Sequence, residues 1–173
     1  MRGGIVLKLE SRFLALATIA SVVVIVDQLT KLYIHSHFAV GDSTTVIQSY
    51  FNITYVRNTG AAFGILRDSF ESFRATFFML MPPVAMLIII SIMRGVTNTD
   101  RWQILALSLI FGGAVGNYID RLRFGYVIDF LEFHLRDFYS WPTFNVADSS
   151  IVVGVILLLL MMKFVKQPKK VTT

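Results

Sequence analysis

Acidic and amide side chains interrupt the otherwise apolar second half of the chain, and they could do chemistry together. They are, in order, Asn117, Asp120, Asp129, Asn145 and Asp148. Two carboxylates brought to one partly desolvated place cannot both ionise cheaply, so one proton is shared between them. A pair of this kind supplies a base that activates water and an acid that protonates a leaving amine. The spacing therefore raises the hypothesis of aspartic peptide-bond hydrolysis by Asp129 and Asp148.

Each acid of that pair also has an ordinary structural explanation. Asn145 is a good N-cap, and Asp148 then occupies the third helical position, where a carboxylate meets the positive end of the helix dipole. Asp129 could be a surface charge within an apolar run. The catalytic hypothesis rests on the two acids occurring together.

Composition places the chain among integral membrane proteins. Its 173 residues are 55% hydrophobic and 16% charged, whereas soluble domains average roughly 45–50% and 25%. We expect a single membrane-embedded domain, residues 1–173, of all-α class with four transmembrane helices, since each helix needs roughly 20 mostly apolar residues. The expected helices span approximately residues 13–34, 75–93, 102–121 and 146–164.

Basic residues predict the orientation of these helices. Residues 1–12, 94–101 and 163–173 together carry nine basic and two acidic residues, and the positive-inside rule puts them in the cytoplasm. Both termini are then cytoplasmic and the acids of the first paragraph lie near the outer face. The basic balance indicates topology, and no nucleic-acid partner is expected.

The sequence also excludes several kinds of chemistry. It contains no cysteine, which rules out disulfides and thiol catalysis. His35, His37 and His134 lack a metal-site pattern, and we interpret His35 and His37 as an interfacial feature. We expect no metal and no cofactor.

Two of the expected helices are short of apolar length at their outer ends. Residues 13–26 and 149–162 are each 14 uncharged residues, about 21 Å of helix, against a hydrocarbon core of roughly 30 Å. Asp27 and Asp148 should therefore lie at or within the outer boundary. Asp27 is four residues from Lys31, so a structural ion pair on one helix face is expected.

The outer segment, approximately residues 36–70, has the pattern of a small sheet. Residues 51–57 alternate apolar and polar side chains and are rich in strand formers, and residues 44–47 offer a partner strand. The small residues from Asn58 to Gly64, including Gly60, either bring backbone close to a ligand or form an ordinary Asn-x-Gly turn.

The third helix carries both packing and polar signals. Gly112 and Gly116 make a small-xxx-small surface for close helix packing, whereas Asn117, Asp120 and Arg121 share one face at the outer end. From residue 121 to 141, aromatic side chains mixed with charges predict an amphipathic segment lying in the membrane interface.

Since the helices alternate in direction, one outer site could collect all these polar groups, and acids at membrane depth mark function. A proton-coupled transporter or channel is the main rival, although its relay would need ionisable groups at several depths. A non-catalytic assembly or lipid-binding protein is the second rival, but it leaves the short apolar lengths at Asp27 and Asp148 unexplained.

Five motifs, in order, resemble those of the bacterial lipoprotein signal peptidase (signal peptidase II) family. They are Asp27-Gln28-Leu29-Thr30-Lys31, Arg57-Asn58-Thr59-Gly60-Ala61-Ala62-Phe63, Gly112-Gly113-Ala114-Val115-Gly116-Asn117-Tyr118-Ile119-Asp120-Arg121, Val127-Ile128-Asp129-Phe130 and Phe144-Asn145-Val146-Ala147-Asp148-Ser149. They extend from the first helix to the fourth.

The resemblance implies an inner-membrane aspartic endopeptidase with four transmembrane helices, a small extracytoplasmic β-cradle and an interfacial amphipathic helix. We expect the protein to be a monomer. The resemblance also implies a substrate that is a prolipoprotein bearing diacylglycerol on a cysteine, reached through membrane lipid and cut just before that cysteine. Asp129 and Asp148 match the catalytic pair. The supporting or substrate-binding positions match Asp27, Asn58, Gly60, Asn117, Asp120, Arg121 and Asn145.

Overall fold

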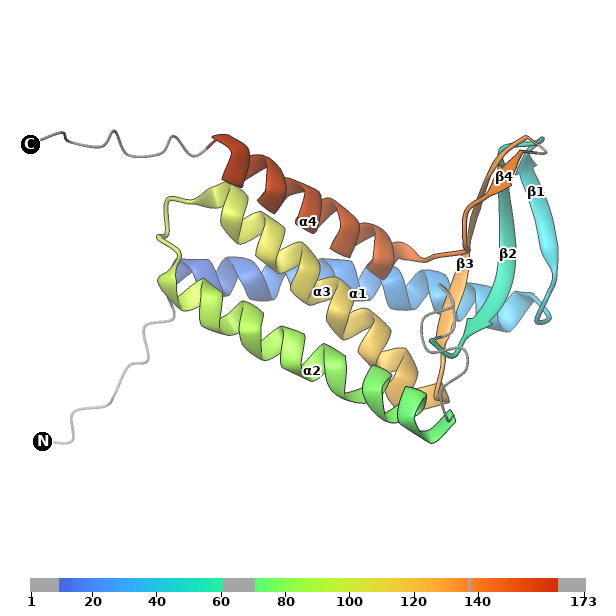
Figure 1. Ribbon diagram of the computed structural model, residues 1–173, viewed down its shortest axis with the longest axis horizontal. Coiled ribbons are helices and arrows are strands. Elements are labelled where there is room, and N and C mark those ends of the chain that lie inside the picture. The colour runs from blue at the N-terminus through green and yellow to red at the C-terminus, as the bar shows by residue number, and fades with distance from the viewer. Residues whose placement is uncertain (1–9, 61–70, 137, 165–173) are drawn as a thin grey trace, which may run out of the picture.

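The structure is a computed structural model that describes residues 10–60, 71–136 and 138–164. Four helices form a bundle with a small sheet at one end (Figure 1). Each is long and apolar enough to cross a membrane, which confirms the four predicted spans. The helices are α1 (Ser11–His37), α2 (Glu71–Gly95), α3 (Arg101–Phe124) and α4 (Val146–Phe164).

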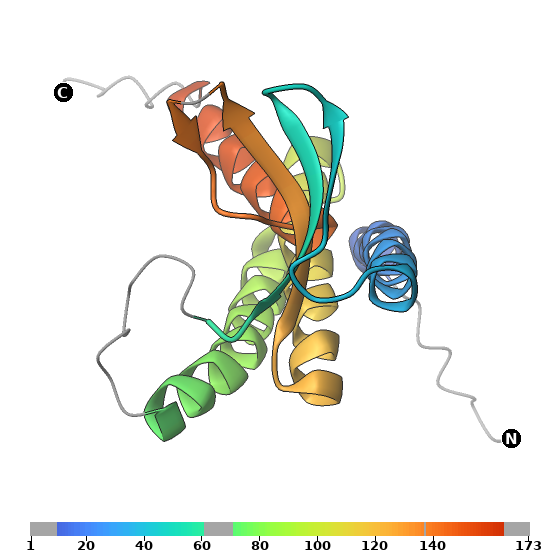
Figure 2. The same ribbon diagram turned by 90° about the vertical axis from the view of Figure 1, so that its right-hand side faces the viewer.

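Helix α3 is the central element of the bundle. Half of its most apolar window is buried within the protein, against 11–17% in the other three helices, and it lies between α1 and α2 when seen from the sheet end (Figure 2). Its glycines allow this. A Cβ at Gly112 would lie 3.0 Å from the backbone of Ala20 in α1, and one at Gly113 would lie 2.4 Å from the carbonyl oxygen of Ala147 in α4. The predicted packing role of the small residues is confirmed.

The sheet is antiparallel, in the order β1 (Ser43–Ile47), β2 (Phe51–Asn58), β3 (Val127–Leu135) and β4 (Tyr139–Ser140). The predicted pairing of β1 with β2 is confirmed, and Thr44 faces Ile53 in the register. Residues 61–70 of the predicted β-rich segment lie outside the described part of the chain.

Most of the predicted amphipathic segment, residues 121–141, is strand, so the interfacial helix that the resemblance implied does not lie in its described part. Gly125 ends α3 in a left-handed conformation, with φ 76°, and most of the following residues form β3 and β4. Aromatic and charged residues suit an interface in either conformation, so composition alone did not separate helix from strand. Pairing with β2 favours the strand, because the backbone N–H and C=O groups at the edge of β2 need hydrogen-bond partners and β3 supplies them.

Strand β3 also ties the sheet to the start of α4. The backbone N–H groups of Phe130 and Leu131 donate to the carbonyl oxygen of Phe144, at 3.0 and 2.8 Å. Beneath the strand, a buried cluster that includes Ile34, Ile128 and Phe130 joins the sheet to α1. The chain just before α4 is therefore held against the middle of β3.

We predict that Gly113→Ala destabilises the protein by about 1–3 kcal/mol, as overpacking of a tight core does. The new methyl group would meet backbone of α4, which cannot rotate away. Thermal unfolding in detergent measures the effect. Gly95→Ala is the matched control, since nothing lies within 4 Å of a Cβ there. Equal unfolding temperatures for the two variants would contradict this account of the α3–α4 contact.

Candidate active site

The two predicted catalytic acids come from different elements. Asp129 lies on β3 opposite Val56 of β2, next to an irregularity in the β2–β3 register. Asp148 lies in the first turn of α4. The backbone N–H of Asp148 donates to Asn145 Oδ1 at 2.8 Å, and the N–H of Asn145 donates to Asp148 Oδ2 at 3.3 Å. The predicted helix cap is confirmed, and it leaves Asp148 Oδ1 available for another contact.

Two asparagines join these carboxylates into one chain of hydrogen bonds. Asn145 Nδ2 donates to Asp129 Oδ1 at 2.7 Å and to Asn117 Oδ1 at 3.1 Å. Asn117 Nδ2 in turn donates to Asp148 Oδ1 at 2.7 Å. A strand, the central helix and the start of α4 thus meet at a single polar centre, where Asn117, Asp129, Asn145 and Asp148 lie together.

Asn58 holds the other oxygen of Asp129. Its Nδ2 donates to Asp129 Oδ2 at 2.9 Å, and its Oδ1 accepts the backbone N–H of Gly60 at 2.8 Å. Gly60 has a φ of 96°, and a Cβ there would lie 2.3 Å from the ring of Phe78. The Asn-x-Gly turn predicted as one alternative is present, and it fixes which amide atom of Asn58 faces Asp129. Residues 61–64 of that loop lie outside the described residues.

Burial changes the acidity of Asp129, whose side chain is only 1% exposed. Desolvation, followed by the charge of Asp148, raises the pKa of Asp129 from 3.8 to about 7, against smaller opposing effects of Asn58, Asn145 and Lys31. A carboxyl with this pKa is partly protonated near neutral pH. The site can therefore contain an acid and a carboxylate base at once.

Asp129 lines a pocket of ≈ 290 Å³ that lies between β2 and the segment before α4. Its lining residues are Val56, Arg57, Asn58, Thr59, Asp129, Pro142 and Thr143. Sequence reasoning missed Thr59, Pro142 and Thr143 as pocket residues. Nothing in their type marks them, and only the antiparallel pairing around Asp129 brings them together.

Arg121 lies beside the centre on α3. Its guanidinium donates to the carbonyl oxygen of Asn117 at 3.3 Å and lies 5.8 Å from the centroid of the Phe78 ring. It also interacts electrostatically with both Asp148 and Asp129. A cation at this place can offset negative charge that develops during a reaction.

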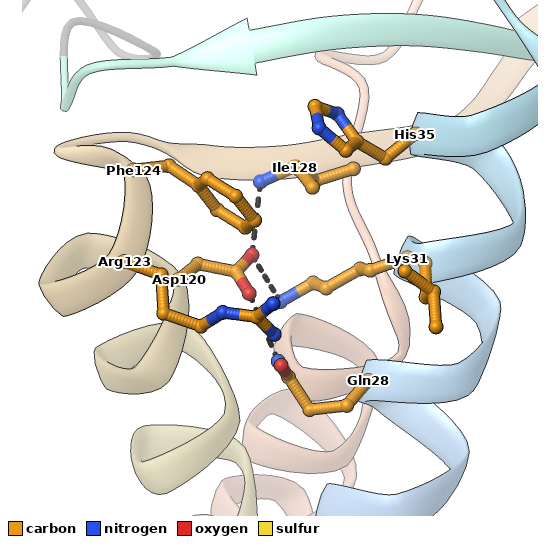
Figure 3. Close-up of a pocket in the computed structure, with 8 residues that line it drawn as sticks. Gln28, Lys31, His35, Asp120, Arg123, Phe124 and Ile128 are labelled. Atoms are coloured by element: carbon orange, nitrogen blue, oxygen red, sulfur yellow. Dashed lines mark hydrogen bonds and ion pairs between the residues drawn. The ribbon is translucent and has the colours of Figure 1, made fainter.

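Asp27 and Asp120 form a buried ion cluster with Lys31, which also contacts Asn117 of the polar centre. Lys31 Nζ is 2.9 Å from Asp27 Oδ2 and 3.0 Å from Asp120 Oδ2. The predicted Asp27–Lys31 pair is confirmed, with Asp120 as an added partner. Gln28, which sequence reasoning did not single out, donates to both carboxylates; its contact with Asp120 is drawn in Figure 3.

The histidines lie apart from this centre. His35 Nδ1 contacts the Tyr55 hydroxyl at 2.6 Å, and His134 lies 3.5 Å from a Glu132 oxygen. Within residues 10–60, 71–136 and 138–164, no group of three His, Asp or Glu side chains is placed to hold a metal ion.

Four membrane-spanning helices with a carboxylate pair at their junction with a small sheet are the features of a membrane-embedded aspartic peptidase. Comparison with known proteins identifies the family within that class. A family model described as Signal peptidase (SPase) II matches residues 19–164, so the chain belongs to the signal peptidase II family.

Curated relatives and solved structures agree with this assignment. The lipoprotein signal peptidase of Syntrophus aciditrophicus (strain SB) is 43% identical, over 80% of this chain and 86% of its own. The lipoprotein signal peptidase of Syntrophotalea carbinolica is 45% identical, over 87% of this chain and 91% of its own. A solved bacterial membrane enzyme, determined by the in meso method at 2.3 Å, is 38% identical with a TM-score of 0.76, over 91% of this chain and 94% of its own.

We predict that one carboxyl group of the folded protein titrates near pH 7 and that Asp129→Asn removes this titration. Asp148→Asn should lower the pKa of Asp129, because one raising influence is gone, but leave it above 3.8, because desolvation remains. Infrared difference spectroscopy of the protonated carboxyl band measures both effects. Asp100→Asn, in the α2–α3 turn, should leave the titration unchanged. A wild-type titration confined to pH 4 would contradict this electrostatic description.

Proposed function

We propose that this protein removes the signal peptide of diacylglyceryl-modified prolipoproteins, cutting just before the lipid-bearing cysteine, with Asp129 and Asp148 as the catalytic pair. The observation that carries the proposal is the hydrogen-bonded chain from Asp129 through Asn145 and Asn117 to Asp148. Relatives that are named lipoprotein signal peptidase support the substrate class.

In the proposed reaction, Asp129 and Asp148 share one proton, so that one member of the pair is the acid and the other is the base. The ionised aspartate takes a proton from water, and the resulting hydroxide attacks the scissile carbonyl carbon. The protonated aspartate hydrogen-bonds to the carbonyl oxygen, and a proton from the pair passes to the leaving amine when the carbon–nitrogen bond breaks. The proton balance closes within the pair and the water, without a covalent intermediate.

The supporting residues contact either Asp129 or Asp148, or orient a residue that does. Asn58 and Asn145 each hold one oxygen of Asp129, and Asn117 holds one oxygen of Asp148. Gly60 orients Asn58. Arg121 is proposed to offset the negative charge that grows on the attacked carbonyl oxygen.

We further propose that both termini are cytoplasmic and that the aspartate pair works near the outer face of the inner membrane. The first turn of α1 and the last turn of α4 lie at the end of the bundle away from the sheet (Figure 1), and the basic residues favour that end for the cytoplasm. The substrate's lipid then reaches the pair from the bilayer. We also propose that residues 1–173 act as one peptidase domain and as a monomer.

Transport across the membrane is less well supported. Asp27, Asp120, Asp129 and Asp148 gather at the sheet end of the bundle. There Asp27 and Asp120 accept backbone N–H groups, of Ala147 and Ile128, and Asp129 and Asp148 accept asparagine amides. A proton relay needs groups spread over several depths. An acid pair around a pocket suits hydrolysis better.

The test is cleavage of a diacylglyceryl-modified prolipoprotein by the purified protein in detergent. We predict that Asp129→Asn and Asp148→Asn each lower the rate by roughly 10²–10⁴-fold, the usual contribution of a positioned acid or base. Amounts are matched by folded protein. Asp100→Asn makes the same chemical change far from the pair and should cleave normally. Wild-type rates in either site variant would refute the assignment of the pair.

A further inference from the structure

The buried ion cluster of Asp27, Lys31 and Asp120 is connected to the backbone beside each acid of the catalytic pair. Asp27 Oδ1 accepts the backbone N–H of Ala147, the residue immediately before Asp148, at 2.9 Å. Asp120 Oδ2 accepts the backbone N–H of Ile128, the residue immediately before Asp129, at 3.0 Å (Figure 3). The same type of contact therefore occurs twice, once for each member of the pair.

Lys31 is the group that these contacts share. Its ammonium lies 2.9 Å from Asp27 Oδ2 and 3.0 Å from Asp120 Oδ2. Its third contact is Asn117 Oδ1, at 3.0 Å. An ammonium group has three N–H donors and no acceptor, so these three oxygens use its whole hydrogen-bonding capacity.

The third contact also decides how Asn117 is turned. With Oδ1 facing the ammonium of Lys31, Nδ2 faces Asp148 and donates to it at 2.7 Å. The reverse orientation would place an NH₂ group against an ammonium and a carbonyl oxygen against a carboxylate. Lys31 thus favours, together with the Asn145 amide that donates to the same oxygen, the Asn117 orientation that holds Asp148.

Stability alone does not account for this cluster. All three side chains are at most 2% exposed, and a buried ion pair is weak evidence for stability because desolvation offsets its attraction. Apolar packing between α1 and α3 would hold these helices with less cost. What apolar side chains could not do is accept the N–H groups of Ala147 and Ile128 at fixed positions.

We propose that Lys31 is a positioning residue for the aspartate pair: its ammonium group orders Asp27, Asp120 and Asn117, which together fix the backbone before Asp148, the backbone before Asp129 and the carboxylate of Asp148. The proposal rests on the proposed function, since it concerns the geometry of the same pair. Lys31 is not among the residues that line the pocket beside Asp129. Its loss should therefore affect the chemical step and leave substrate binding intact.

The experiment measures kcat and KM on the diacylglyceryl-modified prolipoprotein for Lys31→Met and Lys31→Arg, per folded molecule. In Lys31→Met we expect kcat to fall by roughly 10²-fold, the effect of a misplacement of about 1 Å, with KM within about twofold of wild type. Lys31→Arg keeps the charge, but its planar group cannot reproduce three contacts around one nitrogen. We expect kcat in that variant to fall by about tenfold, also without a change in KM.

Controls separate the possible failures. Thr18→Val alters a polar side chain that bonds within α1, at Leu14, and should behave as wild type. If Lys31→Met does not fold, Lys31→Arg decides the question. Wild-type kcat in the folded Lys31 variants, or a rise in KM with kcat unchanged, would overturn the positioning role. If Asp129→Asn and Asp148→Asn also cleave normally, the proposed pair fails; if they are inactive, only the role of Lys31 fails.

Discussion

The desolvation of carboxylates is the constraint on which this structure depends. Asp27, Asp120 and Asp129 are each at most 1% exposed, at the end of a bundle built to face lipid. Such groups persist only when hydrogen bonds and counter-charges replace water. Most of the polar side chains of the junction serve this purpose, and the same burial gives Asp129 a pKa of about 7. One physical cost thus explains both the polar network and the acidity of its central member.

The bundle and the sheet contribute differently to this network. Helix α3 approaches α1 and α4 closely through glycines, which brings Asn117 and Asp120 within reach of both neighbours. The sheet supplies Asp129 and Asn58 from adjacent strands. Because β3 also pairs with Phe144, the start of α4 is fixed against the strand, and Asn145 can bridge the two parts.

Much of this arrangement could be predicted from local pattern. Apolar length gave the four helices, alternation gave β1 and β2, and the spacing of Asp27 and Lys31 gave their ion pair. Strands β3 and β4 could not be predicted, because the pairing of β3 with β2 joins residues about 70 to 80 positions apart. The pairing of Asp27 with the backbone before Asp148 was equally hidden, since a backbone N–H carries no mark in the sequence.

The order of elements along the chain has a consequence for biosynthesis. Asp129 becomes ordered with β3, but its partner Asp148 and the bridging Asn145 belong to the last helix. During synthesis from the N-terminus, the site is incomplete until that helix has entered the membrane and reached α3. A chain interrupted before residue 145 would contain Asp129 but not its proposed partner Asp148. With Asp129 and Asp148 as the proposed catalytic pair, peptidase activity begins only after the last helix has been inserted.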